Sequence, residues 1–185
     1  MWSPRGIDNE GFTLKILLAQ GSYRYLSGTT LTRGTYSLAS LMPGWKFKHG
    51  AWDITVMAGP DFQLHSFTPD DLTNDLRGQH LGLRGGIDVW WQRSASTMMQ
   101  ASLSASSLGA SYSGRIAGGW RMMEKFWIGP EFIVNGDRTY QQYRLGAHVT
   151  SLIIGTIETT FAMGYARDSD VRSGLYGRFG FIMKR

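Results

Sequence analysis

The sequence predicts an all-β fold in which antiparallel strands run up and down around one barrel, as a single domain spanning residues 1–185. Extended segments alternate apolar residues with polar or small ones along most of the chain, which is the pattern of a strand with one apolar and one polar face. Turn residues separate these segments at spacings of roughly 12 to 20 residues, and no stretch shows a convincing helical period. These observations together predict a sheet of consecutive hairpins.

The pattern is clearest over residues 126–166, where three extended segments are joined by two turns. In the middle segment Leu145 falls on an apolar face, whereas Arg144 and His148 fall on a polar one. The turns are marked by Asn135-Gly136-Asp137 and by the region around Gly155. This part of the chain therefore predicts a β-meander.

The same alternation predicts the remaining elements. Before this meander we expect strands near residues 11–25, 31–48, 52–67, 81–91, 97–108 and 112–122, and after it a closing strand near 175–183. His49-Gly50 is typical of a tight hairpin turn. The longest polar connection begins at Thr68 and runs to Asp75. The total is about ten (ten to twelve) strands.

Composition limits the classes of protein to which the chain belongs. Charged residues make up only 18% of the chain, below the usual quarter, and this deficit favours an apolar exterior. The absence of cysteine excludes disulfides, thiol chemistry and cysteine-based zinc sites. The net charge of +5 comes from basic residues that are spread along the whole chain without a basic run, so we expect no nucleic-acid partner.

The residues on each face favour a membrane barrel. Charges and glycines share the polar face, and aromatic residues lie near the predicted strand ends, as in interfacial girdles: Trp45, Trp52, Trp91, Trp120, Trp127, Tyr140 and Tyr165. The fold prediction is therefore an antiparallel up-and-down transmembrane β-barrel of about ten (ten to twelve) strands, with its apolar face toward lipid. A soluble ligand-binding barrel of the lipocalin type stays open as an alternative, because alternation alone fits both arrangements.

The beginning of the chain lacks an export signal. No apolar run is long enough for a transmembrane helix, and the first six residues lack the apolar core of a signal peptide. Trp2-Ser3-Pro4 is typical of the tail of an earlier strand. We therefore expect a signal, and with it a first strand, upstream of Met1.

His148 and Ser151, with Glu158 and Asp168 nearby in sequence, raise the alternative of an outer-membrane hydrolase of the lipid A deacylase type. Alternation places His148 and Ser151 on opposite faces of one strand, which argues against a nucleophile–base pair. We therefore predict no catalytic residues and no enzymatic activity.

No metal or cofactor is expected. The acidic loop after Thr68 lacks the spacing and the glutamate of an EF-hand calcium loop, and the histidines show no metal-ligand spacing. The glycine-rich segments 82–86 and 114–119 lie inside strands, so a phosphate-loop interpretation fails.

Several segments resemble the BcsS family of bacterial cellulose-biosynthesis proteins, and the likeness covers nearly the whole chain. The segments are Trp2-Ser3-Pro4, Asp8-Asn9-Glu10-Gly11-Phe12, Gly21 to Tyr25, Trp127-Ile128-Gly129-Pro130-Glu131, Asn135-Gly136-Asp137, Tyr143-Arg144-Leu145-Gly146-Ala147-His148, Gly164 to Asp170 and Gly174-Leu175-Tyr176-Gly177. No single motif is diagnostic; their order and spacing carry the resemblance. The chain departs from the family pattern in lacking a signal peptide and a preceding strand, and from outer-membrane barrels generally in lacking a terminal aromatic residue.

The resemblance implies a non-enzymatic barrel in the outer membrane of a Gram-negative bacterium that assists cellulose biosynthesis, as an export conduit or as a scaffold of the secretion complex. The implied partners are outer-membrane lipid, a β-glucan chain and cellulose-secretion subunits. Aromatic rings stack on sugars and polar groups bond to hydroxyls, so we predict ligand-binding residues on the interior face: Tyr23, Arg84, Asp88, Trp90, Arg115, Arg144, His148 and Tyr176.

Overall fold

The computed structural model describes residues 1, 3–4, 9–27, 29–138, 140–154 and 157–183, and these form ten strands. The strands are β1 (Gly11–Ser27), β2 (Thr30–His49), β3 (Trp52–Thr68), β4 (Gly78–Trp91), β5 (Thr97–Ser106), β6 (Tyr112–Met122), β7 (Phe126–Gly136), β8 (Gln141–Ile154), β9 (Ile157–Asp168) and β10 (Ser173–Met183). In the ranges described, no helix could cross a membrane. The predicted all-β class and strand number are confirmed.

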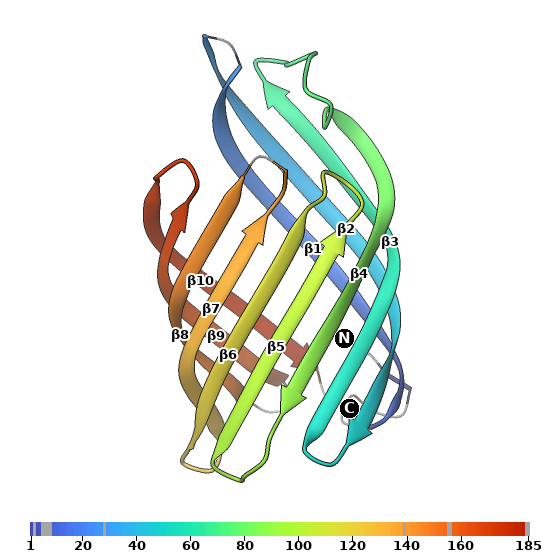
Figure 1. The fold of residues 1–185 in the computed structure, drawn as a ribbon, viewed down its shortest axis with the longest axis vertical. Helices are drawn as coiled ribbons and strands as arrows, with labels where there is room; N and C mark the ends of the chain where they lie inside the picture. Colours follow the sequence, from blue (N-terminus) through green and yellow to red (C-terminus); the bar gives the residue numbers. More distant parts are fainter. Residues whose placement is uncertain (2, 5–8, 28, 139, 155–156, 184–185) are drawn as a thin grey trace.

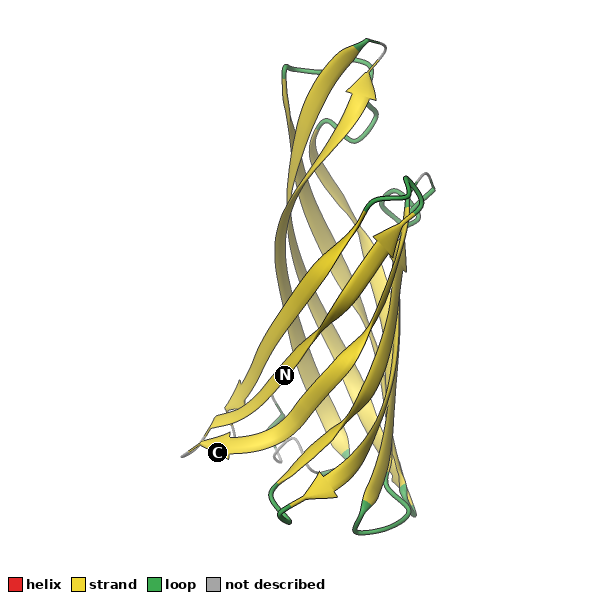
Figure 2. Ribbon diagram, turned by 90° about the vertical axis from the view of Figure 1, so that its left-hand side faces the viewer, coloured by secondary structure: helices red, strands yellow, loops and turns green. Residues whose placement is uncertain are grey.

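Each strand pairs antiparallel with the next one along the chain, so the sheet has the order β1 to β10 without crossovers (Figure 1). The strands coil strongly, and the sheet curls into a half-barrel (Figure 2). β1 to β4 include the longest strands, with 20 residues in β2, and they extend beyond the hairpins of β5 to β10 at one end (Figure 1). The up-and-down antiparallel topology is as predicted.

The expected closure of the barrel is not seen in the described residues. No ladder joins β1 to β10 there, and the two sides meet where Arg172 Nη1, after β9, donates to the Arg24 carbonyl of β1 at 3.2 Å. Tyr176 and Arg178 of β10 instead bond to Glu131 of β7, three strands away. These bonds hold the β10 edge curled over the polar face of its own sheet.

The outer, convex face of the sheet is apolar and the inner face is polar. Leu18, Leu83 and Leu145 on the outer face are 74%, 69% and 65% exposed. On the inner face, Asp61 and Glu131 are 0% and 1% exposed. A soluble lipocalin-type barrel would have the opposite arrangement, with apolar residues filling the interior. The prediction that apolar side chains point outward is confirmed.

One predicted boundary was too long. The strand expected to reach Leu108 ends at Ser106, because the Ser106 amide donates to the Ser111 carbonyl at 2.8 Å and closes a turn. Gly109 and Ala110 in this turn have φ of 60° and 52°. A left-handed backbone at two successive residues reverses the chain before the alternation of side chains has visibly ended.

Candidate functional site on the polar inner face

Asp61 is the centre of a buried polar group that we call the Asp61 cluster, formed by Asp61, Ser40, Gln63, Arg84 and Ser106 from β2 to β5. Arg84 donates to both Asp61 oxygens, through Nε at 3.2 Å and Nη2 at 3.1 Å. The hydroxyls of Ser40 and Ser106 each donate at 2.5 Å, and the Gln63 amide donates at 2.9 Å. One carboxylate therefore accepts five bonds and neutralises one guanidinium.

Glu131 on β7 is the centre of a second group, the Glu131 cluster, which contains Glu131, Arg115, Arg178, Tyr176 and Arg144. Arg115 Nε and Arg178 Nη2 each donate to Glu131 Oε2 at 2.8 Å, and the Tyr176 hydroxyl donates to Oε1 at 3.0 Å. This cluster links β6 and β7 to the edge strand β10 across the inner face.

Tyr176 crosses β9 and β8 to reach Glu131 because glycines clear its path. Gly164 and Gly146 occupy the paired positions on those strands, in register with Tyr176. A Cβ at Gly146 would lie 2.5 Å from the Tyr176 hydroxyl. The Arg144 guanidinium carbon lies 5.5 Å from the Tyr176 ring centroid, in a cation–π contact. With glycines beneath its path and a guanidinium over its ring, Tyr176 is poorly placed for the predicted sugar stacking.

Asp88 and Trp90, two further predicted ligand-binding residues, lie on the inner face and also have partners within the protein. Asp88 of β4 forms an ion pair of 2.8 Å with Lys15 of β1. Trp90 meets Trp127 of β7 edge-on, with ring centroids 6.2 Å apart. Trp127 is 5% exposed, so it belongs to the interior and not to the outer aromatic girdle in which the sequence placed it. The side chain of Tyr23 lies outside the described residues.

His148 does not form a catalytic pair with Ser151. Its Nε2 lies 3.0 Å from the Gly118 carbonyl and therefore donates, which leaves Nδ1 to accept from the Thr150 hydroxyl at 2.9 Å. Ser151 has a φ of 62° beside a bulge in β8, and its hydroxyl donates to Glu158 at 2.8 Å. The hydrolase alternative thus lacks the bond between nucleophile and base that it needs.

Within the described residues, no group of three or more histidine or acidic side chains could hold a metal ion. In the acidic loop, Asp70 bonds to Arg77 through two contacts of 2.7 Å. Asp71 accepts from the backbone amide and the hydroxyl of Thr73. The calcium-loop alternative gains no support from this arrangement, because these carboxylates serve to order the loop.

Sequence reasoning missed the residues at the centres of the two clusters. Asp61, Glu131 and Arg178 were placed on the polar face by alternation, but none was selected as a site residue. Alternation assigns a side chain to a face and cannot show which strands meet across that face. Four predicted residues do belong to the clusters: Arg84 is part of the Asp61 cluster, and Arg115, Arg144 and Tyr176 are part of the Glu131 cluster.

Comparison with known proteins supplies a family but no characterised relative. Neither a search of curated proteins nor a search of solved structures found a match to the chain. The family model described as cellulose biosynthesis protein BcsS matches residues 1–185. The match covers the whole chain and agrees with the predicted resemblance, so the protein belongs to the BcsS family of cellulose biosynthesis proteins.

Proposed function

We propose that this protein is a non-enzymatic barrel of the Gram-negative outer membrane that acts as a scaffold for the cellulose-secretion machinery. The family is involved in cellulose biosynthesis. The observation that carries the membrane part of the proposal is the inverted distribution of side chains, with leucines exposed and ion pairs buried. Such a distribution exposes an unfavourable apolar area to water but suits a lipid surround.

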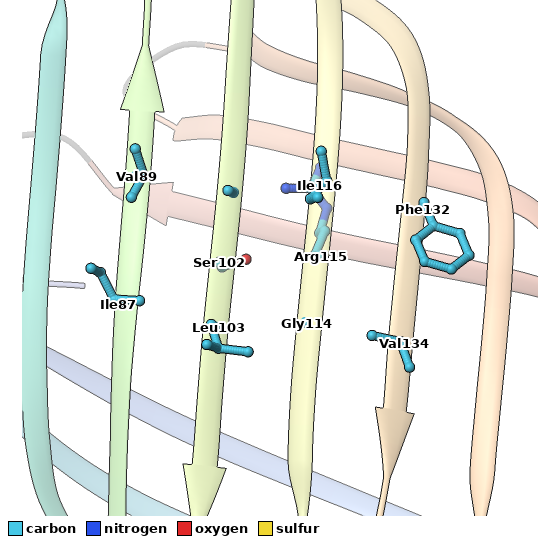
Figure 3. A pocket seen from close by; sticks show the side chains of 10 residues that line it. Ile87, Val89, Ser102, Leu103, Gly114, Arg115, Ile116, Phe132 and Val134 are labelled. Carbon is cyan, nitrogen blue, oxygen red and sulfur yellow. The ribbon is translucent and has the colours of Figure 1, made fainter.

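The outer face has features that fit lipid. Trp45, Trp52 and Trp120 are 47%, 44% and 59% exposed near the ends of their strands that carry the short turns, where an interfacial aromatic girdle would lie. A hollow of about 260 Å³ lies on the outer face of β4 to β7. In Figure 3 apolar side chains such as Leu103 and Phe132 stand in front of the sheet, while Arg115 lies behind it. Acyl chains would meet mostly apolar atoms over this region.

The inner face favours a scaffold over a conduit. Side chains from non-adjacent strands meet across it, as in the pairs Lys15–Asp88, Glu131–Arg178 and Trp90–Trp127. Barrels of about eight strands are just filled by side chains, and open channels use 16 or more. A ten-stranded sheet with these cross-contacts therefore supports a packed polar interior. In this proposal the secretion subunits bind the barrel, and the glucan passes elsewhere.

Replacing a lipid-facing leucine with arginine tests this proposal. In β8, Leu145→Arg should cost about 2–4 kcal/mol if the site lies near the bilayer midplane. The variant should leave the outer-membrane fraction, and cellulose output of the producing cells should fall. Leu72→Arg is the matched control: Leu72 is 77% exposed but lies in the loop after β3, so membrane recovery and cellulose output should not change.

The soluble alternative predicts a different outcome. On a water-exposed surface both substitutions would be almost neutral, and the protein would remain in solution without detergent. Equal behaviour of the Leu145→Arg and Leu72→Arg proteins would therefore refute the membrane assignment. Ion conductance of the purified protein in a planar bilayer would refute the packed interior while leaving the membrane assignment intact.

A further inference from the structure

We propose that the Glu131 cluster is a binding site for a carboxylate or phosphate group carried by a small polar molecule such as an acidic saccharide. The site is formed by the guanidinium groups of Arg115 and Arg178, which share the carboxylate of Glu131, and by that of Arg144, which lies over the Tyr176 ring. This inference goes beyond the scaffold role and does not depend on it, because it concerns what the inner face binds.

The first argument is the charge balance of the cluster. Arg115 and Arg178 share Glu131 as their carboxylate partner, and Arg144 has no carboxylate partner among the described residues. Three guanidinium groups, which stay protonated, are thus set against one negative charge. Burying net charge is costly unless it is paired, so a bound anion would lower the free energy of this arrangement.

The second argument is that hydrogen-bond donors remain unused. Nη2 of Arg115 and Nε of Arg178 are buried and have no hydrogen-bond partner, although both guanidiniums bind the same carboxylate. Buried donors in folded proteins are nearly always paired, with protein, water or ligand. Guanidinium groups bind carboxylate and phosphate oxygens through short, charge-assisted bonds. The unused donors therefore match the ligand that the charge balance favours.

The third argument is access. The Arg178 side chain is 32% exposed, whereas the side chain of its neighbour Glu131 is fully buried. Arg178 also lies on the edge strand β10. A small polar molecule can reach this arginine from the inner side. A lipid headgroup is a poorer candidate, because the apolar face that would hold its acyl chains is on the opposite side of the sheet. A hexose carrying one acidic group combines the required charge with hydroxyls that suit the polar surroundings.

Calorimetric titration of the purified, folded protein in a non-ionic detergent tests the proposal. The probes are glucuronate, glucose 6-phosphate, inorganic phosphate and, as the neutral match of the two sugars, glucose. The acidic probes should bind saturably and glucose should not. Arg178→Gln and Arg144→Gln should each weaken binding of the acidic probes about tenfold, since a hydrogen bond to a charged group is worth that much or more. Arg167→Gln, at an exposed arginine of β9, should leave binding unchanged.

Circular dichroism of each variant shows whether the strands are retained. Arg144→Gln removes no ion pair, so it keeps the test valid if Arg178→Gln does not fold. Saturable binding that is equal for glucose and glucuronate would overturn the anion assignment. The same holds for acidic probes that fail to bind, or that bind folded Arg144→Gln as they bind the unaltered protein. If inorganic phosphate bound but neither acidic sugar did, the anion site would be retained and the assignment of a saccharide ligand would be refuted.

Discussion

The Asp61 cluster and the Glu131 cluster both pair arginine with a buried carboxylate, but they differ in charge balance and in whether all their buried donors have partners. In the first, one carboxylate meets one guanidinium and three further donors, and the side chains of Asp61 and Arg84 are 0% and 6% exposed. In the second, two arginines share one carboxylate, two buried donors have no partner, and Arg178 is partly open. The first cluster is closed and neutral, whereas the second is cationic and accessible.

This difference separates a structural role from a binding role. The Asp61 cluster joins strands that are consecutive along the sheet, so its bonds fix their mutual twist. The Glu131 cluster reaches from β7 to β10 across two intervening strands and fixes how far the sheet curls. A closed cluster has no bonding capacity left for a ligand, but the cationic cluster does. The closed cluster should therefore be costlier to disrupt.

Arg84→Gln should give the largest loss of stability. The substitution leaves the carboxylate of Asp61 buried without a cation, and removing one partner of a buried ion pair typically costs about 3–5 kcal/mol. Arg178→Gln should cost only about 1 kcal/mol, because Glu131 keeps Arg115 and Tyr176 and the lost guanidinium is partly exposed. Urea unfolding in detergent micelles measures both. Equal losses in the two variants would show that the clusters do not differ as described.

Gly146→Ala should give an intermediate loss, because this glycine shapes the Glu131 cluster. A Cβ there would lie 2.3 Å from the Met163 carbonyl oxygen and 2.5 Å from the Tyr176 hydroxyl. The backbone of β9 cannot yield as a flexible side chain can, so we expect a cost of about 1–3 kcal/mol from overpacking.

Gly174→Ala provides the matched control for this substitution. Gly174 lies in β10, and a Cβ there would have no heavy atom within 4 Å. The unfolding midpoint of Gly174→Ala should therefore stay close to that of the unaltered protein. If Gly146→Ala left the unfolding midpoint unchanged, Tyr176 would not need a glycine at position 146 to reach Glu131, and the proposed basis of the cluster would have to be revised.

Much of the fold could be predicted because alternation is a local property. Each strand of the sheet pairs with its neighbour in sequence, so the predicted hairpins also gave the topology. The face assignment followed from the same period: Leu145 and Arg144 point to opposite sides in the structure as they do in the pattern. The family was recognised from the order and spacing of short segments, and the match over residues 1–185 confirms it.

What the sequence could not supply was curvature and its consequences. The curl of the sheet decides that Glu131 meets Arg178 and that Trp90 meets Trp127, and neither pair is close in sequence or in adjacent strands. The separation of the β1 and β10 edges is likewise a property of the whole sheet. The bulge at Ser151 interrupts the regular alternation of side chains, on which the argument that His148 and Ser151 face opposite sides relied. Local patterns specify strands and faces, but long-range geometry specifies sites.

The smallest effect on stability is expected at an exposed arginine–aspartate pair that has the same two-bond geometry as Arg84 and Asp61 in the Asp61 cluster. Arg77 binds Asp70 through two bonds of 2.7 Å in the loop after β3, yet the side chains are 48% and 53% exposed. The hydrogen bond from Arg77 lowers the pKa of Asp70 from its ordinary value. A lowered folded-state pKa means that any stabilisation is present above the unfolded-state pKa and is lost as the pH falls through the folded-state pKa.

Solvent screens this exposed pair, so Arg77→Gln should not measurably shift the urea midpoint at neutral pH. The pKa of Asp70, followed by NMR titration of its carboxyl carbon, should nevertheless rise toward its ordinary value in that variant, because its strongest donor is gone. The two measurements separate geometry from burial as the source of stability. If Arg77→Gln destabilised the protein as much as Arg84→Gln, bidentate geometry alone would account for the Asp61 cluster, and its burial would not explain why it differs from the Glu131 cluster.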